Sequence, residues 1–290
     1  MASIRYDKVP LVIEYDSRVE KVLAYDCNLT EAADLQPVYA IGKKGIAEQT
    51  PQGARTASLS FSYTPVLSGY INKAKSRGDF NIINHVANGL KSSKKPQSSG
   101  ISIKFGGISG EGLLTSYSVS VSPYSPVECS VNFELFGSGQ DVPVSGELSS
   151  QAVSNTNNSS LASSVGHAAY SAFMAAGSPA TITSSDETGI VSDIDYSINF
   201  EYEPVYKLGQ EFPSSFLYHS ASEETTISEN VHETGISFTG KSEDFKLNIK
   251  SLDNNNAMSI DMTSPVLTNV RIGASAGNTV QTEKTIRSFY

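Results

Sequence analysis

Few side chains in this sequence have the types and spacing that chemistry requires. The histidines and cysteines, the usual metal ligands and nucleophiles, are His85, His167, His219, His232, Cys27 and Cys129. No two of them stand at a metal-ligand spacing, and the cysteines form no CxxC pair. We therefore expect no metal site, and an ordinary reduced thiol at each cysteine.

Other catalytic patterns are equally sparse. The many serines include no GxSxG elbow, and the glycine-rich stretch from Gly106 to Gly112 contains no phosphate-binding GxxxxGK[ST] motif. The run Asp253–Asn256 lacks the alternating ligands of a calcium loop and predicts a tight turn. The sequence therefore predicts no catalytic residue and no cofactor, and favours a protein that is not an enzyme.

The chain is acidic, with 21 Lys+Arg against 30 Asp+Glu and a formal charge of −9 over 290 residues. This balance argues against a protein that reads nucleic acid by neutralising phosphates. The basic cluster Lys91, Lys94 and Lys95 predicts a solvated loop, with an electrostatic contact between subunits as the alternative. No signal-peptide pattern and no apolar run of ~20 residues is found, so we expect a soluble, intracellular protein with no membrane partner.

The elements that would position any site are mainly strands. Apolar and polar residues alternate in the segments 9–16, 59–63, 117–121, 127–135, 194–202 and 245–249. Such alternation indicates strands with one face on a core. Helical spacing occurs in Asp79–Lys91 and Leu161–Ala176. The patterns predict an all-β fold, an antiparallel β-sandwich or barrel with one or two short helices.

A segment rich in serine and asparagine, from 145 to 164, divides the chain near its middle. Such a composition cannot supply a core, so it predicts a linker or surface loop. We expect a first β domain over 1–144, with the helix near 79–91. A serine-rich linker with a small-residue helix should follow over 145–178, and a second, diverged β domain over 179–290.

Two pairs of matching segments indicate an internal duplication. PVYAIG at 37–42 matches PVYKLG at 204–209, and we call the spacing from Pro37 to Pro204 the longer offset. Leu114–Val127 aligns with Leu267–Val280, and the spacing from Leu114 to Leu267 is the shorter offset. We assign the difference between the two offsets to the helix near 79–91, which has no counterpart in the second copy. Chance similarity of the segments is the alternative to duplication. The repeat anchors are Pro37, Tyr39, Gly42, Pro204, Tyr206 and Gly209.

Each copy is predicted to end in a long β-hairpin, because turn residues separate two alternating runs. In the first copy this hairpin is the candidate for assembly with other subunits. Its apolar residues are Tyr117, Val119, Val121, Val127, Val131, Phe133 and Leu135.

The first half resembles the phage tail-tube protein family. The resemblance is carried by PVYAIG, the turn Thr50-Pro51-Gln52-Gly53 and SLSFSY, and then by GISGEGLLTSYSVSVSPYSPVECSVNFELFG. It covers roughly 9–137, and 190–290 more weakly. It implies a β-sandwich or barrel with a helix on its flank, in which strands of neighbouring subunits join into one barrel. The rings would stack into a conduit for genome ejection, past which DNA slides without specific binding.

The resemblance also implies partners and a location. We expect a virion tail protein made in the host cytoplasm, in contact with a tape measure and a baseplate, and with a sheath where the tail is contractile. Family members mostly carry one domain and form hexamers, so two tandem tail-tube-like domains imply trimeric pseudo-hexameric rings, with hexameric rings as the alternative. A tail terminator, neck or baseplate-hub ring protein is the alternative within virions, and a β-sandwich adhesin is the alternative outside them.

Overall fold

A computed structural model describes the protein over most of its length. The described residues are 9–15, 18–22, 24–32, 35–51, 55–64, 82–93, 101–122, 125–136, 143–149, 180–184, 189–209, 212–231, 245–250 and 256–290. The predicted helix over Leu161–Ala176 lies outside them, and so do most of the proposed linker and most of the tight turn predicted at Asp253–Asn256.

The residues that the structure describes lie mostly in antiparallel strands, which confirms the predicted all-β fold class. In the first half the elements are β1 (Leu11–Tyr15), β2 (Arg18–Val22), β3 (Ala24–Ala32), β4 (Leu35–Val38), β5 (Glu48–Pro51), β6 (Thr56–Tyr63), α2 (Ile82–Ser93), β7 (Ile101–Phe105), β8 (Ile108–Val121), β9 (Glu128–Phe136) and β10 (Val144–Ser145). In the second half they are β11 (Ala180–Ser184), β12 (Gly189–Val205), β13 (Ser215–Val231), β14 (Phe245–Lys250), β15 (Asn256–Met262), β16 (Val266–Gly273) and β17 (Gln281–Phe289).

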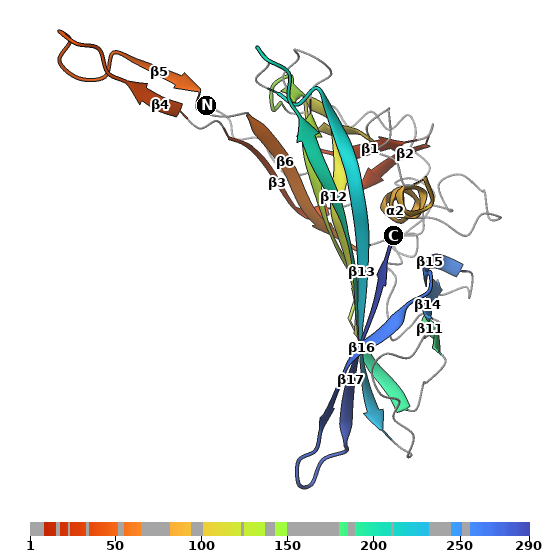
Figure 1. Cartoon of the computed structure of the whole chain (residues 1–290). Helices are drawn as coiled ribbons and strands as arrows, with labels where there is room; N and C mark the ends of the chain where they lie inside the picture. The colour runs from red at the N-terminus through yellow and green to blue at the C-terminus, as the bar shows by residue number, and fades with distance from the viewer. Residues whose placement is uncertain are drawn as a thin grey trace.

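The main sheet contains two groups of strands that lie side by side (Figure 1). The first quartet has the order β3-β6-β9-β8, and the second has the order β12-β13-β17-β16. If the four strands of a quartet are numbered by their order along the chain, their order across the sheet is 1-2-4-3 in both quartets. The two quartets therefore have the same topology.

The strand bounds and registers also match between the two quartets. β9 and β17 have identical lengths, and their bounds are related by the shorter offset found in the sequence. In β8 the pairing with β9 is interrupted by a bulge between Leu114 and Ser116, and in β16 the pairing with β17 is interrupted between Leu267 and Asn269. The bulge is therefore repeated at the same offset, and it is a built-in feature of the quartet rather than a local irregularity.

The first hairpin of each quartet follows the longer offset. The β3–β6 pairing shifts between Ala24 and Asp26, and the β12–β13 pairing shifts at the equivalent position, between Val191 and Asp193. Both offsets that the sequence matches suggested thus recur in the strand registers.

The quartets join through β8 and β12, which pair antiparallel from Val121↔Ile194 to Ser116↔Asn199. The sheet is consequently continuous from one half of the chain to the other. The division into two tandem domains is not confirmed and stays a prediction, because both halves contribute to one sheet.

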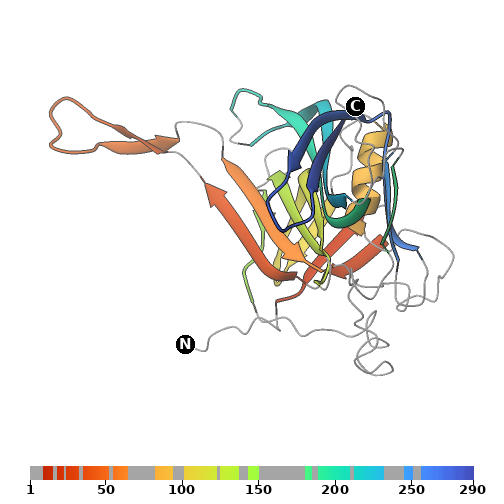
Figure 2. The ribbon, with the colours of Figure 1, turned by 90° about the horizontal axis from the view of Figure 1, so that it is seen from below.

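A second layer covers one side of the quartets. It consists of β2-β1-β7 behind the first quartet, the separate sheet β11-β14-β15 behind the second, and α2. Viewed from below, α2 lies on one side of the sheet and the β4–β5 hairpin projects on the other (Figure 2). The described residues between β13 and β16 form β14 and β15, while 232–244 lie outside the described part, so the loss of a helix there stays a prediction.

The core lies between these layers. Alternating residues of the quartets point into it, as the sequence pattern predicts, and α2 presents Ile83, Val86 and Leu90 to the same space. The helix predicted over 79–91 corresponds to α2. Each apolar side chain buried in this way contributes about 1.5–3 kcal/mol, so the two layers hold each other mainly through burial.

Candidate assembly surface

The seven apolar residues of the predicted assembly hairpin lie in or beside β8 and β9, on the core side. Tyr117 and Val127 are fully buried, and the other five side chains are at most 5% exposed. The hairpin is also internal to the sheet, because β9 pairs with β6 and β8 pairs with β12. These side chains therefore build the core, and any contact of this hairpin with another molecule uses its opposite face.

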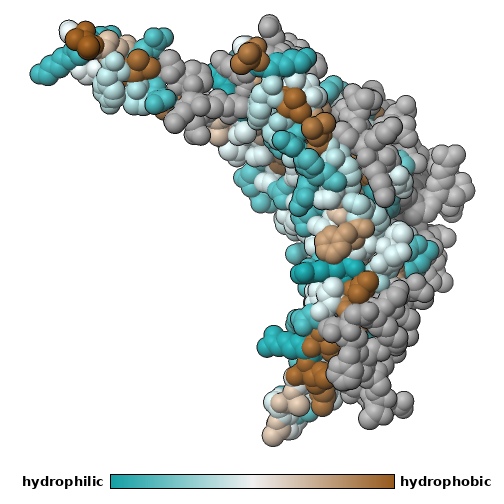
Figure 3. Space-filling model, in the orientation of Figure 1, coloured by the Kyte–Doolittle hydropathy of each residue, from teal (hydrophilic) through white to brown (hydrophobic). Residues whose placement is uncertain are grey.

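That opposite face is mostly polar across both quartets, with Phe289 and Val266 as its exposed apolar members, and we call it the polar face. Serines lie opposite one another on successive strands, with Ser62 beside Ser130, Ser130 beside Ser118, and Ser118 beside Ser197. Ser62 and Ser130 are hydrogen-bonded through their hydroxyls at 3.1 Å. Figure 3 shows the sheet in profile, with mostly hydrophilic residues along the upper part of its hollow side and apolar residues toward its lower end.

The polar face has a defined membership. Its residues are Asp26 and Asn28 on β3; Ser60 and Ser62 on β6; Glu128, Ser130 and Asn132 on β9; Ser116, Ser118 and Ser120 on β8; Asp193, Asp195, Ser197 and Asn199 on β12; Ser222, Glu224, Thr226 and Ser228 on β13; Glu283, Thr285, Arg287 and Phe289 on β17; and Val266, Asn269 and Arg271 on β16.

The charge of the polar face is negative. It contains several carboxylates and no lysine, and its two cations are Arg271 and Arg287. Arg287 Nε lies 2.5 Å from Glu224 Oε2, so this arginine is already paired with a carboxylate of the neighbouring strand. Small hydroxyl and amide side chains separate the charges. Such a surface offers a polyanion repulsion and few groups that would bind it.

The two ends of the quartet series are open edges within the described part of the chain. β3 pairs with β6 alone, and β16 pairs with β17 alone. Each therefore presents a row of backbone N–H and C=O groups on its outer side, which is the usual site at which another strand adds to a sheet.

The repeat anchors lie in two equivalent turns at the same end of the quartets. Ala47 N donates to Val38 O at 2.7 Å, and at the equivalent position in the second copy Ser214 N donates to Val205 O at 2.8 Å. The two turns therefore have equal length. Pro37 lies on β4 and Pro204 at the end of β12; Gly42 and Gly209 both adopt positive φ, 87° and 84°, which favours glycine.

Each of these turns exposes apolar side chains. Ile41 and Leu208 occupy equivalent positions and are completely exposed, and Tyr39 and Tyr206 beside them are 71% and 44% exposed. Figure 3 shows apolar atoms at the tip of the β4–β5 hairpin, which carries the first of the turns. These paired apolar tips make the two turns candidates for contact with another molecule.

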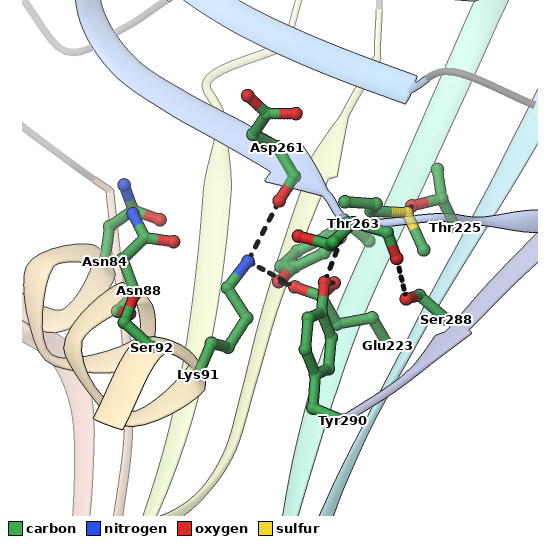
Figure 4. A network of polar contacts seen from close by, with 12 residues as sticks. Asn84, Asn88, Lys91, Ser92, Glu223, Thr225, Asp261, Thr263, Ser288 and Tyr290 are labelled. Carbon is green, nitrogen blue, oxygen red and sulfur yellow. Dashed lines mark hydrogen bonds and ion pairs between the residues drawn. The ribbon is translucent and has the colours of Figure 1, made fainter. Parts of the chain in front are cut away.

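Lys91 was expected in a solvated loop, and that prediction is wrong. It lies in the last turn of α2, is 8% exposed, and its Nζ is 2.6 Å from Glu223 Oε1 on β13 (Figure 4). Nζ also donates to the backbone oxygen of Asp261 at 3.0 Å. The helix packs against the core, so the lysine is carried inward to a partner that local sequence does not reveal. Lys94 and Lys95, the rest of the predicted cluster, lie outside the described residues.

Glu223 is the centre of this network. Its Oε1 also accepts a hydrogen bond from Tyr196 at 2.5 Å, and its Oε2 accepts one from Tyr290. Tyr290 OH in turn accepts from the backbone N–H of Thr263 at 2.9 Å. The buried carboxylate is therefore satisfied by one cation and two hydroxyls, and the network joins α2 to the C-terminus.

Burial also perturbs tyrosines and cysteines in the core. Desolvation raises the pKa of Tyr117 and of Tyr196 well above 10, and the carboxylate of Glu223 adds to the effect at Tyr196. Desolvation raises the pKa of Cys27 and of Cys129 to about 12. These thiols are neutral at physiological pH and are poor nucleophiles.

The residues that the structure describes form no group of His, Cys, Asp and Glu placed to hold a metal ion. Within the same residues, no helix is both long and apolar enough to span a bilayer. His219, on β13, contacts Glu203 at 2.8 Å in an exposed pair. The surfaces that remain as candidates for function are the polar face, the two open edges and the apolar turns.

Comparison with models of protein families gave no match, and comparison with curated proteins gave none either.

Proposed function

We propose that this protein is a structural subunit of a bacteriophage tail tube, which assembles with itself into stacked rings that conduct the genome. The observation that carries the proposal is the pair of equivalent quartets, which form one curved sheet with a polar hollow face and an open edge at each end. A series of like quartets with open ends can be extended by further copies, and closure into a ring leaves no edge unpaired.

The polar face supports a role as the lining of the tube. Carboxylates such as Asp195 and Glu128 carry the same sign of charge as DNA phosphates, and the serines between them offer no cation. Few groups on this face would bind DNA phosphates, so DNA in contact with it would slide past without specific binding. The alternate residues of the same strands point to the other side of the sheet and are buried in the core.

The ring composition follows from the two quartets per chain. Because one chain supplies two equivalent units, three chains would give a ring with pseudo-sixfold symmetry. A ring of six chains is the alternative. Contacts with a tape measure, a baseplate or a sheath rest on the resemblance to tail-tube proteins.

Electron microscopy of the purified full-length protein tests the proposal. We expect long tubes with a central channel, and averaged end views that count the chains in each ring. Rings that never stack would contradict a tube and favour a terminator, neck or baseplate-hub protein. A protein that stays monomeric at high concentration would contradict self-assembly altogether.

A further inference from the structure

The junction between the quartets is a template for a contact between chains. Inside the chain, the third strand of the first quartet, β8, pairs with the first strand of the second quartet, β12. The open edges of the sheet are the third strand of the second quartet, β16, and the first strand of the first quartet, β3. A third strand and a first strand therefore pair at the internal junction, and the equivalent third strand, β16, and first strand, β3, are the unpaired edges of the sheet.

Each open edge strand contains one bulge, but both strands lack two other common blocks to strand pairing. β3 and β16 have 9 and 8 residues, and neither contains a proline or a lysine, the residues that commonly block edge strands. Ile272 on β16 is 51% exposed, whereas its counterpart Val119 in the internal junction is 1% exposed. The apolar side chain at this position is therefore buried in the internal junction and exposed to solvent at the β16 edge.

We propose, resting on the proposed function, that β16 of one chain pairs antiparallel with β3 of a second copy of the same chain, in the register of the internal junction. The shorter offset gives the residue of β16 that is equivalent to each residue of β8, and the longer offset gives the residue of β3 that is equivalent to each residue of β12. Each residue pair of the internal junction therefore predicts one residue pair between chains. The internal pair Ser118↔Ser197 becomes Arg271 opposite Thr30. The internal pair Val119↔Tyr196 becomes Ile272 opposite Leu29.

This register is physically consistent on both faces. Ile272 and Leu29 meet on the core side, where Leu29 is already half-buried against the core. Arg271 belongs to the polar face, and Thr30 lies on the same side because it is two residues beyond Asn28 on β3. The contact therefore continues both the core and the polar face into the next chain without a break.

The contact is head-to-tail, since each chain offers one edge of each kind. Heterologous contacts of this type generate rings when the rotation between copies closes. Every junction around the ring would then have the same strand types and register, whether it lies within a chain or between chains.

Disulfide trapping tests the register in the full-length protein. Thr30→Cys and Arg271→Cys are combined with Cys27→Ser, which removes the nearby native thiol. Cβ atoms directly opposite each other are about 4.5–5.5 Å apart in antiparallel pairs, close to the separation in a disulfide. Under mild oxidation we expect covalent dimers and trimers on non-reducing gels from a ring of three chains, with bands up to the hexamer in the alternative ring of six. Reducing agent should collapse them to monomer.

The matched control moves one cysteine by two residues on the same face. Thr30→Cys with Gly273→Cys places the two Cβ atoms on a diagonal of about 7–8 Å, so the covalent bands should be several-fold weaker. Equal bands in both variants, or none in the Thr30/Arg271 variant while tubes form, would overturn the proposed pairing and leave the proposed function standing. A protein that neither cross-links nor assembles overturns both.

A second variant tests the edge itself. Ile272→Lys puts a charge where the neighbouring core would close, so assembly should be lost while circular dichroism and thermal unfolding of the monomer stay unchanged. Val19→Lys is the control, because Val19 is 54% exposed on β2, outside both quartets. Assembly by the Ile272→Lys variant at the wild-type concentration would contradict the pairing.

Discussion

Lys91 Nζ lies 2.6 Å from Glu223 Oε1, and the two residues come from opposite halves of the chain. Both side chains are buried, at 8% and 0% exposure. The pair ties α2, which follows the first two strands of the first quartet, to β13 of the second quartet. It therefore fixes the second layer across the junction of the quartets, in addition to the β8–β12 pairing itself.

Removing this lysine should be costly. Lys91→Ala leaves the buried Glu223 carboxylate without a cation, and loss of one partner of a buried ion pair typically costs about 3–5 kcal/mol. Urea unfolding of the monomer measures the change in free energy. Lys246→Ala is the control, because Lys246 pairs with Asp261 at 3.5 Å with both side chains exposed, and should cost no more than about 1 kcal/mol. Equal losses in the two variants would contradict the role given to the buried pair.

Alkaline pH should destabilise the protein through its buried tyrosines. Burial raises the pKa of Tyr117 and of Tyr196 well above the ordinary value of 10.0, so the unfolded chain loses these protons first. The free energy of unfolding is therefore unaffected by them below about pH 10 and falls as pH rises beyond it. Denaturant titrations at several pH values measure this slope, which should be shallower in Tyr117→Phe. An unchanged slope in that variant would count against the assignment.

Both cysteines should resist alkylation in the folded protein. Burial raises the pKa of Cys27 and Cys129 to about 12, so at pH 8 the thiolate fraction is roughly a thousandfold below that of a free cysteine. Mass spectrometry after treatment with iodoacetamide should show unmodified folded protein and double modification after unfolding in urea. Rapid modification of folded Cys27 would show that its thiol is more accessible than the fold indicates.

Reversing charge on the polar face should make assemblies retain DNA. Glu128 and Asp195 flank Ser120 from neighbouring strands, and both are exposed. Replacing both with lysine should leave assembly intact and cause DNA to sediment with the tubes at low salt and dissociate at higher salt. Glu14→Lys with Asp261→Lys gives the same change in net charge outside the quartets, and should not. DNA retention by both variants alike would argue against a lining role for this face.

The apolar turns should act between rings rather than within them. Ile41 and Leu208 are completely exposed at the same end of the quartets, away from the β3 and β16 pairing. In the proposed tube, Ile41→Ser with Leu208→Ser should leave single rings and shorten or abolish tubes in electron micrographs, because it would remove the apolar contact that we expect these turns to make with the next ring. Val19→Ser is the control. Tubes of wild-type length in the double variant would assign these turns another role.

Local pattern predicted the strands and the helix well, and the reason is visible in particular residues. The alternation from Val127 to Leu135 places every second side chain in the core, because a pleated strand has no other way to bury them. The apolar spacing of Ile83, Val86 and Leu90 predicted α2 within a few residues of its bounds. Periodicity of this kind is a property of short segments, which sequence displays directly.

Contacts between distant segments were not predictable in the same way. The pairing of β8 with β12 and the meeting of Lys91 with Glu223 depend on how whole layers pack, and no local pattern encodes them. The serines of the polar face were visible as the alternate residues of strands, yet their alignment into one surface required the order of the strands. The only trace of the repeated bulge in the sequence is the threonine that follows both Leu114 and Leu267, and a threonine alone does not predict a bulge.

The β8–β12 junction has a consequence for how assembly responds to concentration. Since both strands belong to one polypeptide, this contact forms during folding, and chain connectivity rather than the number of free molecules sets its local concentration. In the rings we propose, every second junction would be of this kind. A ring would then contain half as many junctions between molecules as one made of single-quartet subunits. Dilution would separate whole chains while leaving every intramolecular junction closed.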